Sequence, residues 1–284
     1  MANMAEVSKA VLITGCSSGI GEQTAIRLAT AGWKVYATAR RPESIAHLEA
    51  AGCQTLALDV CDEQSMGAAV AAVEAAEGAV GILINNAGYS QSGAIESVAL
   101  DEVRRQFETN VFGLVRMCQL VLPKMRAQRY GRIVNISSMG GELVFPGGGF
   151  YHATKYSVEA ISEALRYEVG GFGVEVVVIQ PGLIITEFGE TAGGSLAGAE
   201  AGDYAAFNAA VGSLTVNAYK GPMSKLGGGP DAVAAKIEKA IGSKRPRTRY
   251  KVTLSAGAMM RIRKLVTDRM WDRMMSSNYP RPGA

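Results

Sequence analysis

The sequence predicts one α/β domain with a doubly wound parallel sheet of about seven strands and helices on both faces. Short apolar runs alternate with longer amphipathic stretches along most of the chain. Strands separated by helices need crossover connections, and these connections produce a parallel sheet that is covered on both sides. Glycine-rich and polar motifs directly follow several of the apolar runs. This position is expected of a ligand site, because such sheets bind ligands at the carboxyl ends of their strands.

Each expected strand is a short apolar run. The expected strands lie at 10–14, 34–39, 54–58, 81–85, 132–137, 174–180 and 250–254. The helical pattern between them is clearest at 22–31, 101–128 and 151–169. Proline breaks the helical hydrogen-bond ladder, so Pro123 should kink or interrupt the second of these helices. No repeat or linker divides residues 1–284, and a composition with 48% hydrophobic and 19% charged residues fits a single globular domain.

The first expected strand leads into a glycine-rich loop, Gly15-Cys16-Ser17-Ser18-Gly19-Ile20-Gly21, and then into a helix. Glycines let the backbone approach a ligand closely, and the dipole of the following helix favours an anion. The loop is therefore predicted to cradle the diphosphate of a dinucleotide on a Rossmann-type sheet. Its spacing differs from the Gly-x-Gly-x-x-Gly of other dinucleotide folds, and an ordinary tight turn is the alternative. The expected contacts are Gly15, Ser17, Ser18, Gly19, Ile20 and Gly21.

Tyr151 and Lys155 form a Tyr-x-x-x-Lys pair that begins thirteen residues after Ser138. Positions i and i+4 of a helix share a face, so the Lys ammonium would lie beside the Tyr phenol. A phenol has a pKa of about 10, and a nearby cation lowers that pKa. Such a phenol is a suitable general acid or base for interconverting an alcohol and a carbonyl. Ser138, with Ser137 as the second choice, would hold the same oxygen. By itself, the pair also occurs on many solvated helices.

Taken together, these motifs resemble those of the short-chain dehydrogenase/reductase family. The resemblance runs from about residue 9 to residue 186, in the family's order and at its distances. The motifs that carry it are Thr14-Gly15-x-x-x-Gly19-x-Gly21, Asn85-Asn86-Ala87-Gly88, Asn110, Ser138, Tyr151 with Lys155, and Pro181-Gly182-x-x-x-Thr186. Residues 13–21 and 35–40 are more narrowly similar to the hydroxysteroid and retinol dehydrogenase branch. The family spacing selects Ser138 over Ser137.

The resemblance implies a role for each matched position. Asn110 would complete the catalytic set by anchoring a water that connects Lys155 to solvent, although an Asn can also hold a local helix kink. Lys155 would also contact the nicotinamide ribose. Asp59, followed by Val60, would meet the adenine, with a helix cap as the alternative for the Asp. The remaining implied cofactor contacts are Asn86, Ala87, Gly88, Tyr151, Pro181, Gly182, Ile184 and Thr186.

The end of the second strand predicts which cofactor is bound. An Asp or Glu there would bind the adenosine ribose and favour NAD, but this strand ends Thr38-Ala39-Arg40-Arg41-Pro42. The planar guanidinium of Arg suits a phosphate dianion. We therefore expect NADP(H), with Arg40 as the better candidate for the phosphate contact and an ordinary loop charge as the alternative for either Arg.

These observations predict an NADP(H)-dependent oxidoreductase that interconverts a secondary or aldehyde-level alcohol and a carbonyl on a small hydrophobic substrate. Residues that could line its pocket, or belong to the core, are Leu143, Val144, Phe145, Tyr204 and Phe207. Residues 187–225, rich in Gly and Ala at 189–202, would form a substrate lid by family resemblance, or else a solvated loop. The other functions considered are a non-catalytic dinucleotide sensor and a relative of the sugar-nucleotide epimerases.

The charge is unevenly distributed, although its net value is only +3. The basic C-terminal extension, 244–284, holds ten Lys and Arg against two Asp within 244–273. It could be a solvated helix face, a surface that meets acidic lipid, or an aid in attracting an anionic cofactor. Nucleic-acid binding is not expected, because no recognition motif accompanies the charge.

Cysteine and histidine usage argues against disulfides and metal sites, because the four Cys are scattered and the chain has two His. No apolar run approaches the roughly 20 residues of a membrane span. The first residues lack the apolar core of a signal peptide, so a cytoplasmic location is expected. The expected helices at 101–128 and 151–169 carry apolar residues on more than one face. Because members of the family pair through these helices, a homodimer or homotetramer is expected.

Overall fold

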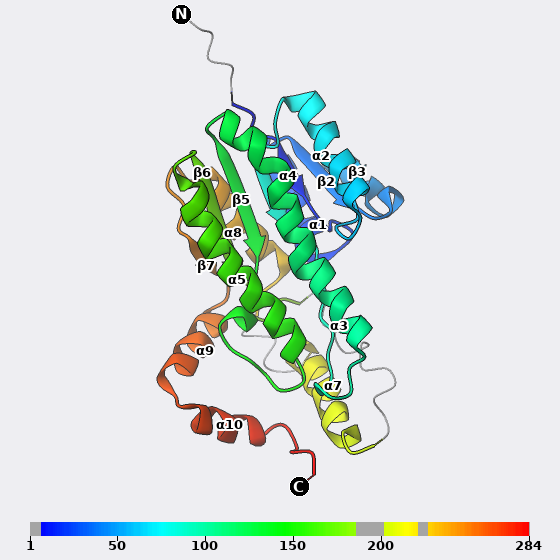
Figure 1. Cartoon of the computed structure of the whole chain (residues 1–284), viewed down its shortest axis with the longest axis vertical. Helices are drawn as coiled ribbons and strands as arrows, with labels where there is room; N and C mark the ends of the chain where they lie inside the picture. Colours follow the sequence, from blue (N-terminus) through cyan, green and yellow to red (C-terminus); the bar gives the residue numbers. More distant parts are fainter. Residues whose placement is uncertain (1–6, 186–201, 221–226, 284) are drawn as a thin grey trace, which may run out of the picture.

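The computed structural model describes residues 7–185, 202–220 and 227–283. Within these residues, a wholly parallel seven-stranded sheet has the order β3-β2-β1-β4-β5-β6-β7 (Figure 1). The strands are β1 (Val11–Ile13), β2 (Val35–Ala39), β3 (Gln54–Ala57), β4 (Ile82–Asn85), β5 (Gly131–Ile136), β6 (Val174–Gln180) and β7 (Arg249–Lys251). The predicted doubly wound α/β domain is therefore confirmed.

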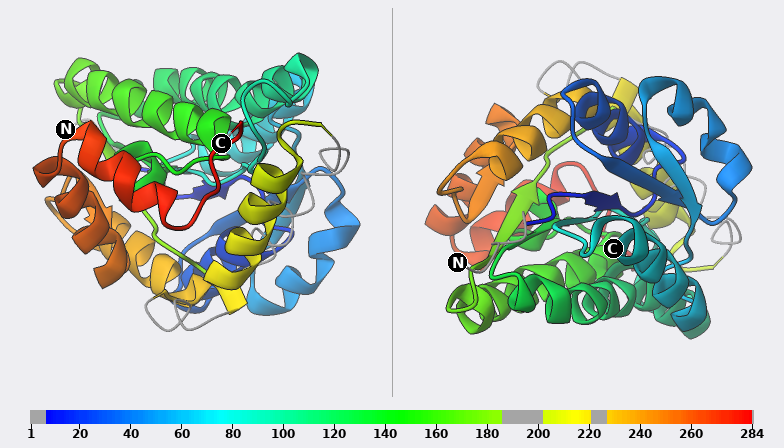
Figure 2. Two further views of the ribbon diagram at one scale, coloured as in Figure 1. Left: turned by 90° about the horizontal axis from the view of Figure 1, so that it is seen from below. Right: turned by 90° about the horizontal axis from the view of Figure 1, so that it is seen from above.

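Helices cover both faces of the sheet (Figure 2). The helices on one face are α1 (Gly19–Thr30), the 3-10 helix η1 (Pro42–Ala51) and α8 (Pro230–Gly242). The helices on the other face are α2 (Glu63–Glu77), α4 (Gly113–Ala127) and α5 (Gly149–Gly170). Because both faces are buried, the central strands read as continuous apolar runs rather than as alternating ones.

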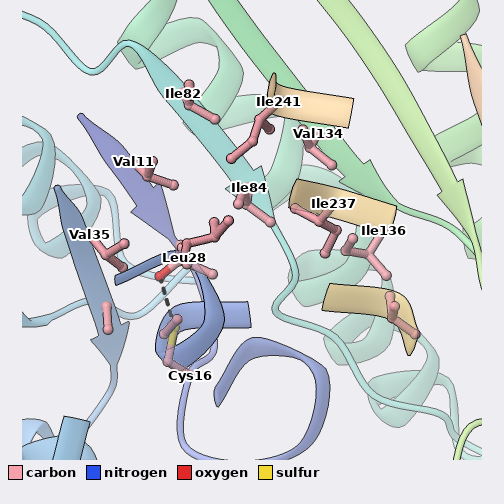
Figure 3. Packing of buried hydrophobic residues seen from close by; sticks show 14 of the residues in the cluster. Val11, Cys16, Leu28, Val35, Ile82, Ile84, Val134, Ile136, Ile237 and Ile241 are labelled. Carbon is pink, nitrogen blue, oxygen red and sulfur yellow. Dashed lines mark hydrogen bonds between the residues drawn. The ribbon is translucent and has the colours of Figure 1, made fainter. Parts of the chain in front are cut away.

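Two hydrophobic clusters, one on each face, fill the space between sheet and helices. In the first, Val11, Ile82 and Val134 of adjacent strands pack with Leu28 of α1 and Ile237 of α8 (Figure 3). The second lies between the sheet and α2, α4 and α5. Burying one such aliphatic side chain contributes about 1.5–3 kcal/mol. The apolar runs that predicted the strands are thus the residues that hold the layers together.

The order of strands reverses beside β1, because β2 lies on one side of it and β4 on the other. Ligands of open α/β sheets bind at the carboxyl ends of the strands at such a reversal. The glycine-rich loop follows β1, and Asn86 follows β4. The topology therefore brings two of the predicted cofactor motifs to one place.

The long helix expected at 101–128 is divided into α3 (Leu100–Phe107), a π-helical turn η2 (Glu108–Phe112) and α4. Of the kink or interruption expected at Pro123, the interruption is not found, because α4 continues through this residue. The carbonyl that Pro123 leaves without a partner belongs to Gln119, an exposed residue, so water can replace the missing bond. The irregularity lies instead at η2, which contains Asn110.

The last strand is shorter than expected, because residues 252–254 do not belong to it. Thr253 accepts a hydrogen bond from the backbone N–H of Ala256 and caps α9 (Leu254–Leu265). Thr267 caps the following α10 (Asp268–Ser276) in the same way. Both helices lie beyond the carboxyl ends of the strands (Figure 1). Among the described helices, none is long and apolar enough to cross a membrane.

Of the expected lid at 187–225, the structure describes 202–220, which includes the helix α7 (Ala205–Lys220), whereas 187–201 and 221–225 lie outside the described residues. Asn208 of α7 accepts a hydrogen bond from the backbone N–H of Ala94 at 3.0 Å. Gly147 has a φ of +80°, and a Cβ there would clash with the Val211 side chain. The described helix is therefore packed on the loop that precedes Tyr151.

The predicted oligomer stays a prediction, and exposed apolar residues near α4 and α5 support it. The exposed fractions are 56% for Phe112, 89% for Tyr167 and 42% for Phe172. We expect sedimentation velocity at micromolar concentration to show a dimer or tetramer that Tyr167→Asp weakens, because a buried charge opposes association. Leu100→Asp, at an exposed Leu on α3, is the control. A wild-type monomer would rule out this assembly.

Candidate active site

The glycine-rich loop has the conformation that its sequence predicts for an anion cradle. Gly15 and Gly19 have φ of +71° and +61°, values that favour glycine. A Cβ on Gly21 would clash with the carbonyl oxygen of Gly15. Ser18, the N-cap of α1, makes no side-chain capping bond. The first N–H groups of α1 therefore remain for an anion.

Within the loop, Cys16 alone turns fully into the core, where its thiol donates to the carbonyl oxygen of Ile13 (Figure 3). Its burial raises the pKa of the thiol to about 12. Ser17 is exposed, while Ser18 and Ile20 are half-buried. The three predicted contacts other than glycine are thus accessible, and the loop fits the diphosphate of a dinucleotide.

Asn86 connects the end of β4 to this loop. Its amide nitrogen donates to the carbonyl oxygens of Thr14 and Gly15 at 2.9 and 2.8 Å. The Thr14 hydroxyl in turn accepts from the backbone N–H groups of Asn86 and Ala87, both at 3.0 Å. A Cβ on Gly15 would approach Ala87 Cα to 2.9 Å. These contacts make Asn86 and Ala87 supports of the loop.

The predicted adenosine contacts lie at the ends of β2 and β3. Arg40 is exposed directly after β2, and the described residues provide no ion pair for Arg40 or Arg41. Asp59 Oδ1 accepts from the backbone N–H of Cys61, whereas the cap of α2 is Asp62. The alternative reading of Asp59 as a helix cap is therefore wrong. Val60, the other cofactor contact predicted at the end of β3, is buried.

Tyr151 and Lys155 lie on one face of α5, as the sequence predicts. The Lys155 ammonium is 5.7 Å from the centroid of the Tyr151 ring. Lys155 is 7% exposed, and its ammonium donates to the carbonyl oxygen of Ile136, the last residue of β5, at 2.8 Å. Burial lowers the pKa of Lys155 to about 8, although the charge of Glu159 opposes the shift. The site thus holds a buried ammonium beside a phenol.

Asn110 is brought to the same place by the π-helical turn. Its side chain accepts from the backbone N–H of Tyr89 at 3.1 Å and donates to the Tyr89 carbonyl at 2.9 Å. It also donates to the Thr154 hydroxyl at 3.1 Å. A Cβ on Gly88 would lie 3.1 Å from Asn110 Oδ1 and 3.8 Å from Lys155 Nζ. These three residues therefore converge, and Asn110 also joins the irregular turn to α5.

Ser138 follows β5 and is more accessible than the preceding residue, Ser137. Its hydroxyl accepts from the backbone N–H of Gly140 at 3.0 Å and caps the 3-10 turn η3 (Met139–Gly141). Ser137 is only 2% exposed, so its hydroxyl is buried away from a substrate. This difference favours Ser138, in agreement with the choice made from the sequence.

Residues after β6 complete the predicted cofactor set only in part. The Pro181 carbonyl accepts from the backbone N–H of Met139 at 2.8 Å, so this loop lies beside the one that carries Ser138. A Cβ on Gly182 would clash with the Thr253 hydroxyl. Ile184 is buried and forms a β-bridge with Gly228. Thr186 lies outside the described residues.

The basic C-terminal extension packs on the loop before α5, which the sequence did not predict. Leu143 is fully buried against α9, so it belongs to the core rather than to a pocket wall. Trp271 of α10 donates to the carbonyl oxygen of Val144 at 3.1 Å, and its ring lies 6.1 Å from that of Phe145. The sequence signal for this packing was a Trp within a basic helix, because a buried indole N–H needs a hydrogen-bond partner.

The other two predicted pocket residues help to hold α7 in place. Phe207 is buried in a small cluster that includes Tyr204 and Tyr279. The Tyr204 hydroxyl donates to the carboxylate of Glu96 at 2.7 Å. The C-terminal residue Tyr279 thus contributes to the same apolar cluster as the helix that follows β6.

His152 was missed by the sequence analysis, although it links the loop at 140–148 to the helix of Tyr151. Its Nε2 accepts from the backbone N–H of Phe145, and its Nδ1 is bonded to the Gly140 carbonyl, both at 3.1 Å. A neutral imidazole with one accepting nitrogen donates from the other, which fits both bonds. A Cβ on Gly140 would clash with the ring, so this glycine makes room for it. His152 is therefore a positioning residue.

His152 should make the protein sensitive to acid. Burial lowers the pKa of His152 from 6.5 to about 4, so the unfolded chain binds this proton more readily than the folded one. The contribution of neutral His152 to the free energy of unfolding is complete above pH 6.5 and is lost as the pH falls through 4. We expect the free energy of unfolding to fall between pH 7 and 5 by about 2 kcal/mol more in wild type than in His152→Gln.

Denaturant titrations at several pH values measure this difference. His47→Gln is the matched control, because His47 is half-exposed on the surface beside Glu22. Parallel pH profiles for wild type and His152→Gln would contradict the assignment. If His152→Gln proves too unstable, direct titration of the two imidazoles by NMR gives the same answer.

A model of the short chain dehydrogenase family matches residues 9–195. The chain is 40% identical over 243 residues to a 3-ketodihydrosphingosine reductase of Bacteroides thetaiotaomicron, covering 85% of this chain and 87% of that protein. It is 32% identical over 276 residues to an NADPH-dependent 3-dehydrocapnine reductase of Ornithobacterium rhinotracheale, covering 93% and 94%.

Solved structures agree with this assignment. A short-chain dehydrogenase from Streptomyces avermitilis has a TM-score of 0.75 and 31% identity, and the match covers 96% of this chain and 99% of that one. Similar structures include complexes with NADP+ and with NAD. The chain, an oxidoreductase by these likenesses, therefore belongs to the short-chain dehydrogenase/reductase family.

Proposed function

We propose that the protein interconverts a hydrophobic ketone or aldehyde and the corresponding alcohol with NADP(H), and that Ser138, Tyr151 and Lys155 carry the reaction. The observation that supports this most is the buried Lys155 ammonium, 5.7 Å from the Tyr151 ring. Burying a cation is costly unless it has partners. Here its partners are a backbone carbonyl and a phenol, an arrangement suited to proton transfer.

Each residue of this group has a separate task. NADP(H), when bound, supplies or accepts the hydride. In reduction, the Tyr151 hydroxyl gives its proton to the substrate oxygen, and in oxidation its phenolate takes that proton back. The Lys155 cation favours the phenolate electrostatically. The Ser138 hydroxyl donates a hydrogen bond to the same substrate oxygen. Asn110 holds the turn beside Lys155, and the residues that would hold the diphosphate are those of the glycine-rich loop.

The preference for NADP(H) over NAD(H) is the second part of the proposal. It is supported by the exposed Arg40 at the end of β2, which has no ion-pair partner among the described residues. The relative from Ornithobacterium rhinotracheale is named as NADPH-dependent. Similar solved structures contain either cofactor, so the charge at Arg40 is the feature of this chain that supports NADP(H) over NAD(H).

The proposed substrate is a hydrophobic carbonyl compound with a long apolar portion. The relative with 40% identity is named a 3-ketodihydrosphingosine reductase. Phe145 is half-buried and its ring contacts those of Trp271 and His152, and Phe207 lies in a small apolar cluster with Tyr279. Aromatic side chains of this kind suit an apolar chain. Steroid and retinoid carbonyls, suggested by the narrower resemblance, belong in the same comparison.

The two other functions that the sequence suggested fit less well. A dinucleotide sensor has no use for a buried ammonium beside a phenol, since burying a charge costs free energy. An epimerase of the extended relatives is expected to have a shifted glycine pattern after the first strand, whereas this chain has Gly15-x-x-x-Gly19-x-Gly21 there.

A panel of carbonyl compounds tests the proposal. NADPH oxidation would be followed by absorbance with 3-ketodihydrosphingosine, shorter 3-ketones, steroid ketones and retinal. The reverse reaction would be followed with NADP+ and the alcohols. We expect turnover of an apolar ketone, with kcat/KM rising as the apolar chain lengthens. No turnover of any carbonyl despite measurable NADPH binding would favour the sensor.

A further inference from the structure

The outer face of α9 is apolar, although it points away from the protein. Ala256 and Met260 form the inner face and are fully buried. Leu254, Ile262 and Leu265 lie on the opposite side of the helix, where their spacing of eight and three residues keeps them on one stripe. Leu254 is 95% exposed and Leu265 is 85% exposed. Nothing in the described part of the chain covers this outer stripe.

A strongly basic cleft of about 530 Å³ adjoins this helix, and Arg261 of α9 is part of its wall. Lys and Arg provide seven of its nine lining residues, and no carboxylate lines it. Arg249 is neutralised by Glu159 and Glu163. In the described residues, six of the lining cations have no ion-pair partner. They are Lys236, Lys239, Arg245, Arg247, Lys251 and Arg261. The cleft therefore offers a concentrated positive charge to an anionic partner.

The next helix has a similar combination of side chains. Met270 and Met274 of α10 are 54% and 39% exposed, and Arg269 and Arg273 are exposed beside them. Trp271, on the other side, is buried against Val144. Exposed apolar side chains next to Arg and Lys are typical of helices that lie in a membrane interface. These apolar side chains would be more stable buried in an apolar environment than exposed to water.

We propose that α9, together with the basic cleft beside it, docks on a bilayer surface that contains anionic phospholipid. Leu254, Ile262 and Leu265 would enter the boundary between headgroups and acyl chains, and the cations of the cleft would pair with lipid phosphates. A second copy of the chain is a poorer occupant of this surface, because two clefts of the same charge would face each other across a two-fold axis. The proposal does not depend on which carbonyl compound is reduced.

Vesicle flotation with the full-length protein tests the proposal directly. We expect binding to phosphatidylcholine vesicles that contain about 30% phosphatidylglycerol, weak binding to phosphatidylcholine alone, and loss of binding as salt is raised, since salt screens the charges. Leu254→Ser/Leu265→Ser should reduce partitioning about tenfold or more, because it removes two apolar insertions. Arg245→Glu/Arg247→Glu should reduce it to a similar extent.

Leu100→Ser is the matched control, because Leu100 is also an exposed leucine but lies on α3. This substitution should leave vesicle binding unchanged. Circular dichroism would show that each variant is folded. Equal binding to neutral and anionic vesicles, or no binding to either, would overturn the proposal. So would unchanged binding of the serine pair, which would leave only general anion attraction. A serine pair that turns a larger oligomer into a smaller one without altering flotation would assign the stripe to a contact between copies.

Discussion

Tyr151→Phe should abolish turnover while leaving cofactor affinity within a few-fold of wild type. The variant keeps the ring, which packs edge-on against His152 with 5.7 Å between centroids, but it loses the proton that the reaction requires. Loss of a positioned acid lowers a rate by about 10²–10⁴-fold. Steady-state rates with the best substrate of the panel, together with titration of NADPH binding, measure both quantities.

Tyr156→Phe is the matched control for this experiment. Tyr156 lies on the same helix, five residues after Tyr151, and its side chain is 44% exposed. Its substitution should leave both kcat and KM close to wild type. Turnover by Tyr151→Phe at a near-wild-type rate would remove Tyr151 from the proposed role, whereas a loss of NADPH binding would point to damage of the site as a whole.

Arg40→Asp should erase or reverse the expected preference for NADPH over NADH. A charge-assisted hydrogen bond contributes about 1.5–3 kcal/mol, so its loss should weaken NADPH binding by about 10–150-fold. The new carboxylate would repel the phosphate of NADPH and could accept a hydrogen bond from the ribose of NADH. Because Arg40 is exposed, the substitution should not disturb folding. Affinities for the two cofactors, measured on wild type and variant, give the result.

Arg41→Asp separates the two neighbouring arginines. The Arg41 carbonyl accepts from the Ser44 hydroxyl at the start of η1, and that contact does not involve the guanidinium. Its substitution should therefore have a smaller effect on the ratio of NADPH to NADH affinity. If Arg41→Asp alone changes the ratio, the phosphate contact belongs to Arg41. Tighter binding of NADH by the wild-type protein would refute the preference itself.

The sequence by itself predicted the features that depend on local pattern. Apolar runs predicted the central strands β1, β2, β4, β5 and β6 to within a few residues, because strands buried on both faces are largely apolar. The glycine spacing predicted the conformation of the loop after β1, because Gly15 and Gly19 adopt positive φ and Gly21 has no room for a Cβ. The i, i+4 relation predicted that Tyr151 and Lys155 share a face.

The tertiary structure alone decided the contacts between segments that are distant in the chain. Trp271 and Val144 are 127 residues apart, and no local pattern indicates that one donates to the other. The end of β7 depended on Thr253, because this residue caps α9 with its hydroxyl and so does not belong to the strand. The bonds of His152 to Gly140 and Phe145 exist only because the loop folds back over α5. Side-chain burial and partners are properties of the packed chain, so the sequence predicts which residues are chemically able to form a site and packing decides which of them meet.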